Sequence, residues 1–199
     1  MGFVTHNEGL LRMVAAKILT LWDEDGRKEG DTLTLRAPNE DIALPLNDEG
    51  KEWIKQLLET FLSLDDAVGL AAPQIGINKQ IIIFRTGDFD KKERIRDDRD
   101  YEILVNPRVT QSRGEQIIMA EGCLSCPDVQ VEIARYPEIK VRGYDKSGKK
   151  ISKRYLDYMA RVVQHELDHL EGRLIVDYDG NLYIPKRKHL FFSKILQKI

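Results

Sequence analysis

Residues 164–170 read Gln-His-Glu-Leu-Asp-His-Leu, and within this stretch His165, Glu166 and His169 form the pattern His-Glu-x-x-His. In an α-helix, residues four positions apart lie on the same face, one turn from each other. Two imidazoles placed in this way can bind one metal ion, and the glutamate between them can reach a water molecule on that ion. The stretch therefore predicts a metal-binding helix and metal-assisted hydrolysis.

The segments around this helix predict several short strands and three further helices. Apolar and β-branched runs predict strands at 80–85, 101–106, 115–120, 129–133, 138–144 and 150–155, with a hairpin turn at 145–148. Helical spacing predicts helices at 8–22, after an N-cap at Asp48, and in the basic tail 187–199, besides the His-bearing helix at 156–171 that Gly172 closes. This order indicates an α+β domain with antiparallel sheets packed around the central His-bearing helix. The charged run 86–100 is expected to be a loop.

Composition restricts the possible functions. The 199 residues fit one domain, and 31 basic against 33 acidic side chains give a net charge of −2. This balance does not indicate nucleic-acid binding or an anionic membrane surface. No apolar run approaches the roughly 20 residues that span a bilayer, and the N-terminus lacks the pattern of a signal peptide. A cytoplasmic protein is the expectation.

The identity of a third ligand decides which kind of hydrolase the pattern belongs to. Many His-Glu-x-x-His proteases take this ligand from downstream of the helix, but here Glu171 stands only two residues beyond His169 and would point elsewhere. Upstream lies Cys123, and a thiolate is a strong ligand for a divalent transition metal. Cys123 would join His165 and His169 and leave a fourth position for water. Cys126 leaves a second interpretation open, a closed Cys₂His₂ zinc site with a structural role.

The sequence resembles the peptide deformylase family in three segments that occur in the family's order. They are 69–74 (Gly-Leu-Ala-Ala-Pro-Gln), 121–125 (Glu-Gly-Cys-Leu-Ser) and 164–169 (Gln-His-Glu-Leu-Asp-His). The resemblance implies a single catalytic domain over 1–199. Its family-like core would be 33–178, preceded by an extension with a helix at 1–30 and followed by the C-terminal helix 187–199.

The resemblance implies an enzyme that removes the formyl group from the N-terminal formyl-methionine of new polypeptides and releases formate. Cys123, His165 and His169 would hold one divalent metal ion, and water on this ion would attack the formyl carbon. Glu166 would act as general base and then as general acid. The family's metal is usually ferrous iron, with zinc, nickel or cobalt as substitutes.

The resemblance also assigns roles around the metal. The side-chain NH of Gln74 and the backbone NH of Leu124 would stabilise the oxyanion. Val68 and Val162 would line an apolar pocket for the methionine side chain, and the small Gly69 would let the peptide backbone lie close. The implied partner is an N-formylmethionyl peptide. A transient ribosome contact through the basic tail is a further hypothesis, and packing of that tail on the protein body is the simpler expectation.

Three positions depart from the family's usual pattern. Ala67 and Asp157 stand where glycine is common, and Gln130 stands where some members have arginine. All three lie outside the expected metal ligands, so they bear on substrate affinity and choice. Two other functions stay open at this stage. One is a peptidase with the same chemistry, and the other is a metal-stapled binding protein that has lost turnover.

Overall fold

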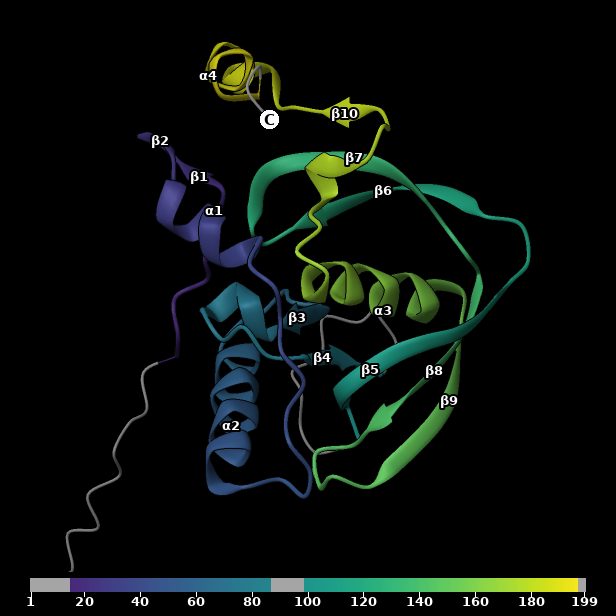
Figure 1. Cartoon of the computed structure of the whole chain (residues 1–199). Helices are drawn as coiled ribbons and strands as arrows, with labels where there is room; N and C mark the ends of the chain where they lie inside the picture. Colours follow the sequence, from purple (N-terminus) through teal and green to yellow (C-terminus); the bar gives the residue numbers. More distant parts are fainter. Residues whose placement is uncertain (1–14, 87–98, 197–199) are drawn as a thin grey trace, which may run out of the picture.

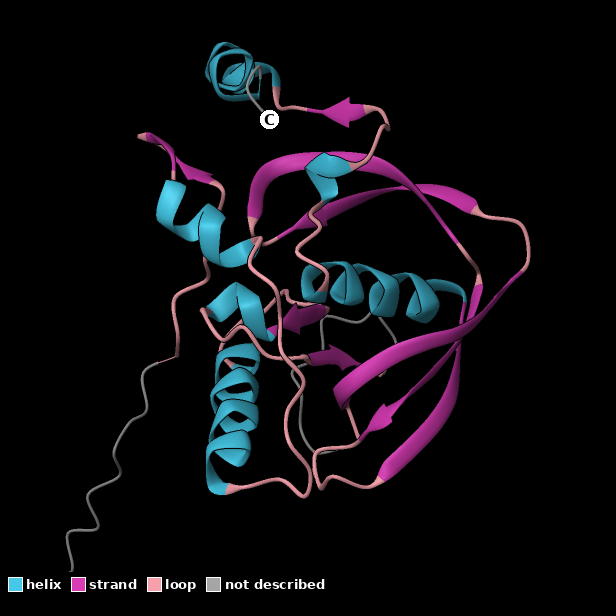
Figure 2. Cartoon of the chain, viewed as in Figure 1, coloured by secondary structure: helices cyan, strands magenta, loops and turns pink. Residues whose placement is uncertain are grey.

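The structure is a computed structural model that describes residues 15–86 and 99–196. Helix α3 (Asp157–Leu170) crosses the middle of the molecule with an antiparallel sheet on each side (Figure 1). The larger sheet has the strand order β3-β4-β5-β8-β9, and the smaller has the order β10-β7-β6. Figure 2 shows the strands in magenta curving around this helix. The predicted α+β fold, with antiparallel sheets around the His-bearing helix, is confirmed.

The elements of the described residues have the following bounds. The strands are β1 (Trp22–Asp23), β2 (Gly26–Arg27), β3 (Gly69–Ala71), β4 (Ile81–Arg85), β5 (Tyr101–Arg113), β6 (Ile117–Cys123), β7 (Cys126–Arg135), β8 (Glu138–Tyr144), β9 (Lys150–Leu156) and β10 (Leu182–Tyr183). The other α-helices are α1 (Glu29–Leu35), α2 (Asp48–Leu62) and α4 (His189–Ile195). Short 3₁₀ helices are η1 (Ala72–Ile75), η2 (Ile175–Asp177) and η3 (Lys186–Lys188).

Strand β4 is buried on both faces because a helix covers each side of its sheet. Successive side chains of a strand point to opposite faces. Ile82 and Phe84 therefore belong to the core around α3, whereas Ile81 and Ile83 belong to the core around α2. All four side chains are fully buried. Burial of this kind stabilises by about 25 cal/mol per Å² of apolar surface, and it fixes α3 against the larger sheet.

A third core packs against the smaller sheet. Val131 and Ile133 of β7 pack there with Trp22 near the N-terminus and Phe192 of α4. The rings of Trp22 and Phe192 meet edge to face with their centroids 5.5 Å apart. The C-terminal tail therefore packs on the protein body, as the simpler expectation had it, and its described helix ends at Ile195.

The predicted helix at 8–22 is wrong over the residues that the structure describes. Residues 15–21 are extended, and Trp22 begins β1; residues 8–14 lie outside the described residues. The backbone NH of Leu19 donates to Gln74 O at 2.8 Å, and that of Leu21 donates to Ser125 O at 2.9 Å. Among the described apolar residues of this stretch, Ile18 packs against the core around α2, and Leu21 and Trp22 are buried in the third core. These side chains are therefore buried without forming a helix.

Residues 22–35 form β1, β2 and α1, none of which was predicted from the sequence. Two smaller predictions need correction. Asn47, one residue before the expected Asp48, caps α2, because its side chain accepts a hydrogen bond from Gly50 N at 2.8 Å. Strand β5 continues to Arg113, past the expected end at Asn106, and its pairing with β8 has two register shifts, the first between Val105 and Arg108. Asn106 stabilises this irregularity by bonding Ile42 N at 2.8 Å and Ile42 O at 2.9 Å.

The remaining predicted elements stand close to their expected bounds. The hairpin turn at 145–148 joins β8 to β9, with the backbone NH of Gly148 donating to Asp145 O. Gly172 follows α3 in the left-handed region at φ +70°, and a β-carbon there would lie 2.9 Å from Arg36 O. Glycine therefore suits the end of the helix both in conformation and in space. Most of the charged run, 87–98, lies outside the described residues.

Candidate metal centre and active site

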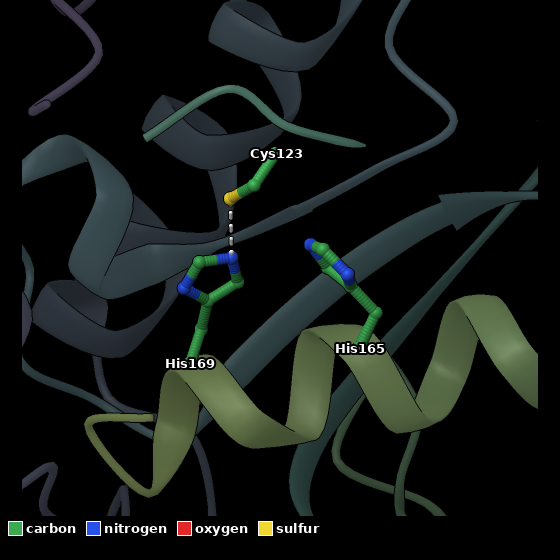
Figure 3. A group of neighbouring side chains, drawn as sticks. All are labelled: Cys123, His165 and His169. Carbon is green, nitrogen blue, oxygen red and sulfur yellow. Dashed lines mark hydrogen bonds between the residues drawn. The ribbon is translucent and has the colours of Figure 1, made fainter. Parts of the chain in front are cut away.

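Three metal-ligand side chains meet between α3 and the end of β6. The ligand atoms of Cys123, His165 and His169 all lie within 4.8 Å of one another, and Cys123 Sγ is 3.3 Å from His169 Nε2. Figure 3 shows both imidazoles rising from the same face of α3 toward the thiol. The structure thus brings together the three residues that the sequence analysis grouped. The opposite face of α3, with Ala160 and Val163, is fully buried in the core and holds the helix in place.

Glu121 fixes the orientation of His165. Its Oε2 lies 3.0 Å from His165 Nδ1, which leaves Nε2 as the nitrogen that faces Cys123. Glu121 also accepts hydrogen bonds from Arg135 at 3.0 and 2.9 Å and from Arg161 at 2.6 Å. Burial by itself raises the pKa of this carboxyl, but the contacts with His165 and Arg135 outweigh burial and lower it to about 2. Glu121 is therefore a buried carboxylate that holds an imidazole in one tautomer.

A second carboxylate, Asp168, extends this network to the C-terminal side of α3. Asp168 Oδ2 accepts hydrogen bonds from Arg135 at 2.6 Å and from the Tyr178 hydroxyl at 2.7 Å. Arg135 also donates to the Tyr178 oxygen at 3.1 Å. From the sequence alone, Asp168 could either orient the helix or face solvent. Its side chain is 14% exposed and its oxygen is bonded twice, so it supports the helix that bears the histidines.

Glu166 is buried beside the three ligand residues, with one unpartnered oxygen. The residue is 4% exposed, and Oε2 makes no hydrogen bond. Burial raises the pKa of Glu166 to about 7, against the opposing effect of His165 and His169. A carboxyl group with a pKa near neutrality can both accept and release a proton at physiological pH.

Gly69 on β3 gives Glu166 the room it occupies. A β-carbon built at Gly69 would overlap the Glu166 carboxylate, with Cδ 2.8 Å away and Cγ 2.9 Å away. The family resemblance assigned Gly69 to substrate contact only. The structure adds a second reason for glycine at this position, which sequence spacing alone does not reveal.

Gln74 links the loop after β3 to the turn that follows Cys123. Its Oε1 accepts from Ala71 N at 2.9 Å, and its Nε2 lies 3.2 Å from Ser125 Oγ and 3.9 Å from Cys123 Sγ. Gln74 and Ser125 are both buried. The amide NH₂ therefore points toward the metal-ligand group. Leu124, in the turn between β6 and β7, is 39% exposed.

A cavity of about 910 Å³ opens beside this group. Its walls come from the segment before β3, the end of β6, the face of α3 and the segment after β10. Among its lining residues are all of the predicted substrate and oxyanion residues: Val68, Gly69, Gln74, Leu124 and Val162. Cys123, His165 and Glu166 also line it, so the metal-ligand group is accessible from a groove.

Cys126 is not part of the metal-ligand group. It stands opposite Cys123 across the tight β6–β7 turn, and its side chain is fully buried in the third core, with Val131 and Ile133 of β7. A hydrogen bond from the Cys126 thiol lowers the pKa of Cys123, and the nearby His169 lowers it further, so the thiolate form is favoured. The chain reverses between Cys123 and Cys126, and the two residues face each other across the turn.

Three further residues of the site, Glu121, Arg161 and Ser125, had no predicted role. Each is buried, polar and bonded to a residue far along the chain. The only signal in the sequence was that Glu121 and Ser125 flank Cys123 in one short motif. The pairing of Arg161 with Glu121 spans 40 residues and depends on how α3 packs against β6.

The chain is similar to known proteins over most of its length. Residues 26–183 match the family model for polypeptide deformylase. A peptide deformylase of Rickettsia akari is 39% identical over 140 residues, which are 70% of this chain and 78% of that protein. A peptide deformylase of a Synechocystis species is 36% identical over 147 residues, which are 74% of each chain.

Solved structures agree with the sequence comparisons. A peptide deformylase from Synechococcus elongatus, solved in complex with actinonin, has a TM-score of 0.68 and 31% identity, covering 92% of this chain and 85% of that one. A probable peptide deformylase from Synechococcus phage S-SSM7 has a TM-score of 0.66 and 36% identity, covering 82% and 99%. The match to the family model, the identity to its members and the shared fold lead to the same conclusion: this chain belongs to the peptide deformylase family.

Proposed function

We propose that this chain removes the formyl group from N-terminal formyl-methionine through a metal centre made of Cys123, His165 and His169. Deformylation and metal dependence follow from membership of the family. The observation that carries the assignment of residues is the meeting of one thiol and two imidazoles within 4.8 Å of one another, beside the buried Glu166 and a groove.

The donor set fits a divalent transition metal. Nδ1 of His165 is hydrogen-bonded to Glu121, so Nε2 of the same imidazole can bind an ion. The lowered pKa of Cys123 favours the thiolate, which is the form that binds metals. These three residues would hold the ion and would leave a further ligand position for water, as catalytic sites require. We assign ferrous iron as the native ion, with zinc, nickel or cobalt as substitutes. A bound ion supplies Lewis acidity and brings the pKa of a coordinated water to roughly 7.

Glu166 moves the proton in this account. Its carboxylate accepts a proton from the attacking water and then delivers it to the amine nitrogen as the carbon–nitrogen bond breaks. The products are formate and a free N-terminal amine. The buried position of Glu166 and its raised pKa support both steps.

We assign Gln74 and Leu124 to stabilising the oxyanion that forms on the formyl group. The Nε2 group of Gln74 already points toward Cys123, and the backbone NH of Leu124 follows Cys123 directly. Donors placed before the reaction stabilise developing negative charge without reorganisation, and each one typically contributes about 10²- to 10³-fold in rate. Val68, Gly69 and Val162 line the groove beside these groups, and we assign them to the methionine residue.

The substrate also suggests where the protein works. New polypeptides begin in the cytoplasm, so we place the enzyme there, with a transient ribosome contact through the basic tail 187–199. Among the helices of the described residues, none has the length and apolar character needed to cross a bilayer.

The test is formate release from formyl-Met-Ala-Ser, with acetyl-Met-Ala-Ser as a control substrate. The parent protein, purified without oxygen, should release formate from the formyl peptide only. Glu166→Gln should keep the fold and the bound metal and lose release by about 10²- to 10⁴-fold, because general acid–base catalysis contributes that much. If Glu166→Gln released formate as fast as the parent protein, Glu166 would not be the proton carrier.

A further inference from the structure

Two cysteines stand opposite each other at the edge of the metal-ligand group. Cys123 at the end of β6 pairs with Cys126 at the start of β7 across a turn of two residues. Both are free thiols, and they are the only cysteines of the chain. The proposed metal centre uses Cys123, whereas Cys126 has no part in it. A second thiol beside a metal ligand therefore needs its own explanation.

The backbone places the two sulfur atoms within reach of a bond. Opposite residues of an antiparallel pair have α-carbons about 4.5–5.5 Å apart and side chains on the same face of the sheet. A disulfide spans α-carbons that are about 4.4–6.8 Å apart. The Cys126 thiol already donates a hydrogen bond to the Cys123 sulfur, so the two sulfur atoms face each other. A disulfide between them requires little movement of the backbone.

The extended segment before α1 holds this turn in place. The backbone NH of Leu21 donates to Ser125 O at 2.9 Å, and the indole NH of Trp22 donates to Pro127 O at 3.1 Å. Neither hydrogen bond involves a sulfur atom. The two cysteines therefore stay opposed while their sulfur atoms change partners.

The two thiols differ in their access to the groove. Both touch the cavity, but Cys126 is fully buried in the third core, whereas Cys123 is partly exposed. A small oxidant in the groove therefore reaches Cys123 first. Redox-sensing cysteines often have this arrangement, in which an accessible thiolate lies next to a second cysteine that resolves its oxidised form.

We propose that Cys123 and Cys126 form a reversible disulfide that releases the metal and stops deformylation while hydrogen peroxide is present. The Cys123 thiolate first attacks one peroxide oxygen, the O–O bond breaks and hydroxide leaves, so that Cys123 becomes a sulfenic acid. The Cys126 sulfur then attacks the Cys123 sulfur, and the S–O bond breaks. The departing hydroxide takes the Cys126 proton and forms water. Two sulfur atoms are thus oxidised while one peroxide is reduced.

The disulfide removes one of the three metal ligands. Metals bind the thiolate, and a disulfide sulfur carries no negative charge, so His165 and His169 are left alone. Metal affinity should fall by more than about 100-fold, because even loss of a hydrogen-bonded partner of a ligand costs about 10- to 100-fold. This inference rests on the proposed function and adds a control of the metal centre.

Reversal distinguishes the disulfide from oxidative damage. A dithiol reduces a disulfide by thiol–disulfide exchange, and disulfides of cytosolic proteins are usually transient ones of this kind. A lone sulfenic acid instead proceeds to sulfinic acid, which thiols do not reduce. Cys126 therefore protects Cys123 from permanent loss, and the metal centre is restored when the peroxide has been consumed.

The experiment uses the zinc-loaded protein, because zinc has no redox chemistry of its own. Hydrogen peroxide is added in steps, and free thiols, intact mass and released zinc are measured on the same sample. In the parent, both thiols should disappear together as the chain loses two hydrogen atoms, and the bound zinc should be released. Dithiothreitol and fresh zinc should then restore zinc binding and formate release to nearly their starting values.

Cys126→Ser is the matched variant, and Cys126→Ala replaces it if serine disturbs the third core. Without the second sulfur, the chain should gain oxygen atoms at Cys123 in place of losing hydrogen. Dithiothreitol and zinc should then fail to restore zinc binding, because sulfinic acid is not reduced.

Several results would overturn the proposal. They are a parent chain that gains oxygen atoms while the Cys126 thiol stays free, a disulfide between two chains, and zinc that stays bound after the disulfide has formed. Equal recovery of the parent and the variants would also contradict it. If the reduced and loaded protein releases no formate while the thiol and zinc results are as expected, the proposed function fails and the disulfide stands.

Discussion

Gly69 and Glu166 are in such close contact that no side chain fits between them. A β-carbon at Gly69 would lie 2.8 Å from Cδ of Glu166, well inside normal contact distance. The smallest residue on the edge strand β3 thus sets the position of the carboxylate that we assign as the proton carrier. A catalytic carboxylate on a helix is positioned here by a strand of the sheet that the helix packs against.

We expect Gly69→Ala to impair catalysis more than folding. The added methyl group pushes the Glu166 carboxylate aside, and misplacement of a catalytic group by about 1 Å can cost about 10²-fold in rate. Formate release should fall by about that factor while the metal content stays near that of the parent. Gly30→Ala is the control, because a β-carbon at Gly30 meets nothing within 4 Å. Unchanged kcat in Gly69→Ala would contradict this relationship.

We expect Glu121→Gln to weaken both metal binding and stability. The neutral amide no longer balances Arg135 and Arg161, and breaking a buried ion pair from one side costs about 3–5 kcal/mol in the free energy of unfolding. Loss of the carboxylate behind His165 should weaken metal affinity about 10- to 100-fold. Denaturant unfolding of the metal-free protein and competition with a chelator measure the two effects separately.

Tyr178→Phe provides a milder change in the same network. It removes one hydrogen bond to Asp168 and one from Arg135 but leaves the ion pair between those two residues. Unfolding should be destabilised by about 1 kcal/mol, with a smaller loss of metal affinity than in Glu121→Gln. If Tyr178→Phe lost as much metal affinity as Glu121→Gln, or more, Glu121 would not be the residue that orients His165 for metal binding.

The extended segment before β1 should support the oxyanion donors. Leu19 N bonds Gln74 O, and Leu21 N bonds Ser125 O, so this segment connects the two loops that carry Gln74 and Leu124. Leu19→Pro removes one of these donors and should lower kcat about tenfold or more with little change in metal content. Leu19→Ala keeps the NH group and serves as the control. Equal kcat values for the two variants would show that the hydrogen bond has no effect on catalysis.

Cys126→Ser tests the closed-site alternative directly. Cys126 is outside the group of ligand atoms, and its thiol only bonds to Cys123. The variant should therefore still bind one ion per chain, with an affinity within about tenfold of the parent, because a serine hydroxyl can donate in place of the thiol. Loss of the ion, measured by elemental analysis after dialysis, would favour a closed Cys₂His₂ site instead.

The sequence predicted the elements whose determinants are local. The position of α3 follows from the spacing of His165 and His169 together with Gly172, which has the left-handed conformation that ends the helix. The hairpin turn at 145–148 likewise depends on four adjacent residues. The joining of Cys123 to the two histidines came from the family resemblance and the known affinity of thiolates for metals.

Features that depend on distant contacts could not be predicted in this way. The apolar spacing before Trp22 suits a helix, but the bonds from Leu19 and Leu21 to remote loops hold this segment extended. Nothing near Gly69 in the sequence indicates that it faces Glu166, 97 positions further on. Local patterns determine the helices and turns, whereas packing between α3 and the two sheets determines the surroundings of the metal ligands.

The central claim is that one ion bound by Cys123, His165 and His169 is required for formate release. It is tested most directly by measuring metal content and formate release on the same sample, while a chelator removes the ion without oxygen and ferrous iron is then added back. The account predicts that release follows occupancy and is complete at one ion per chain, and that Cys123→Ser neither binds the ion tightly nor releases formate. Release from metal-free protein, or no release from fully loaded and folded protein, would contradict it.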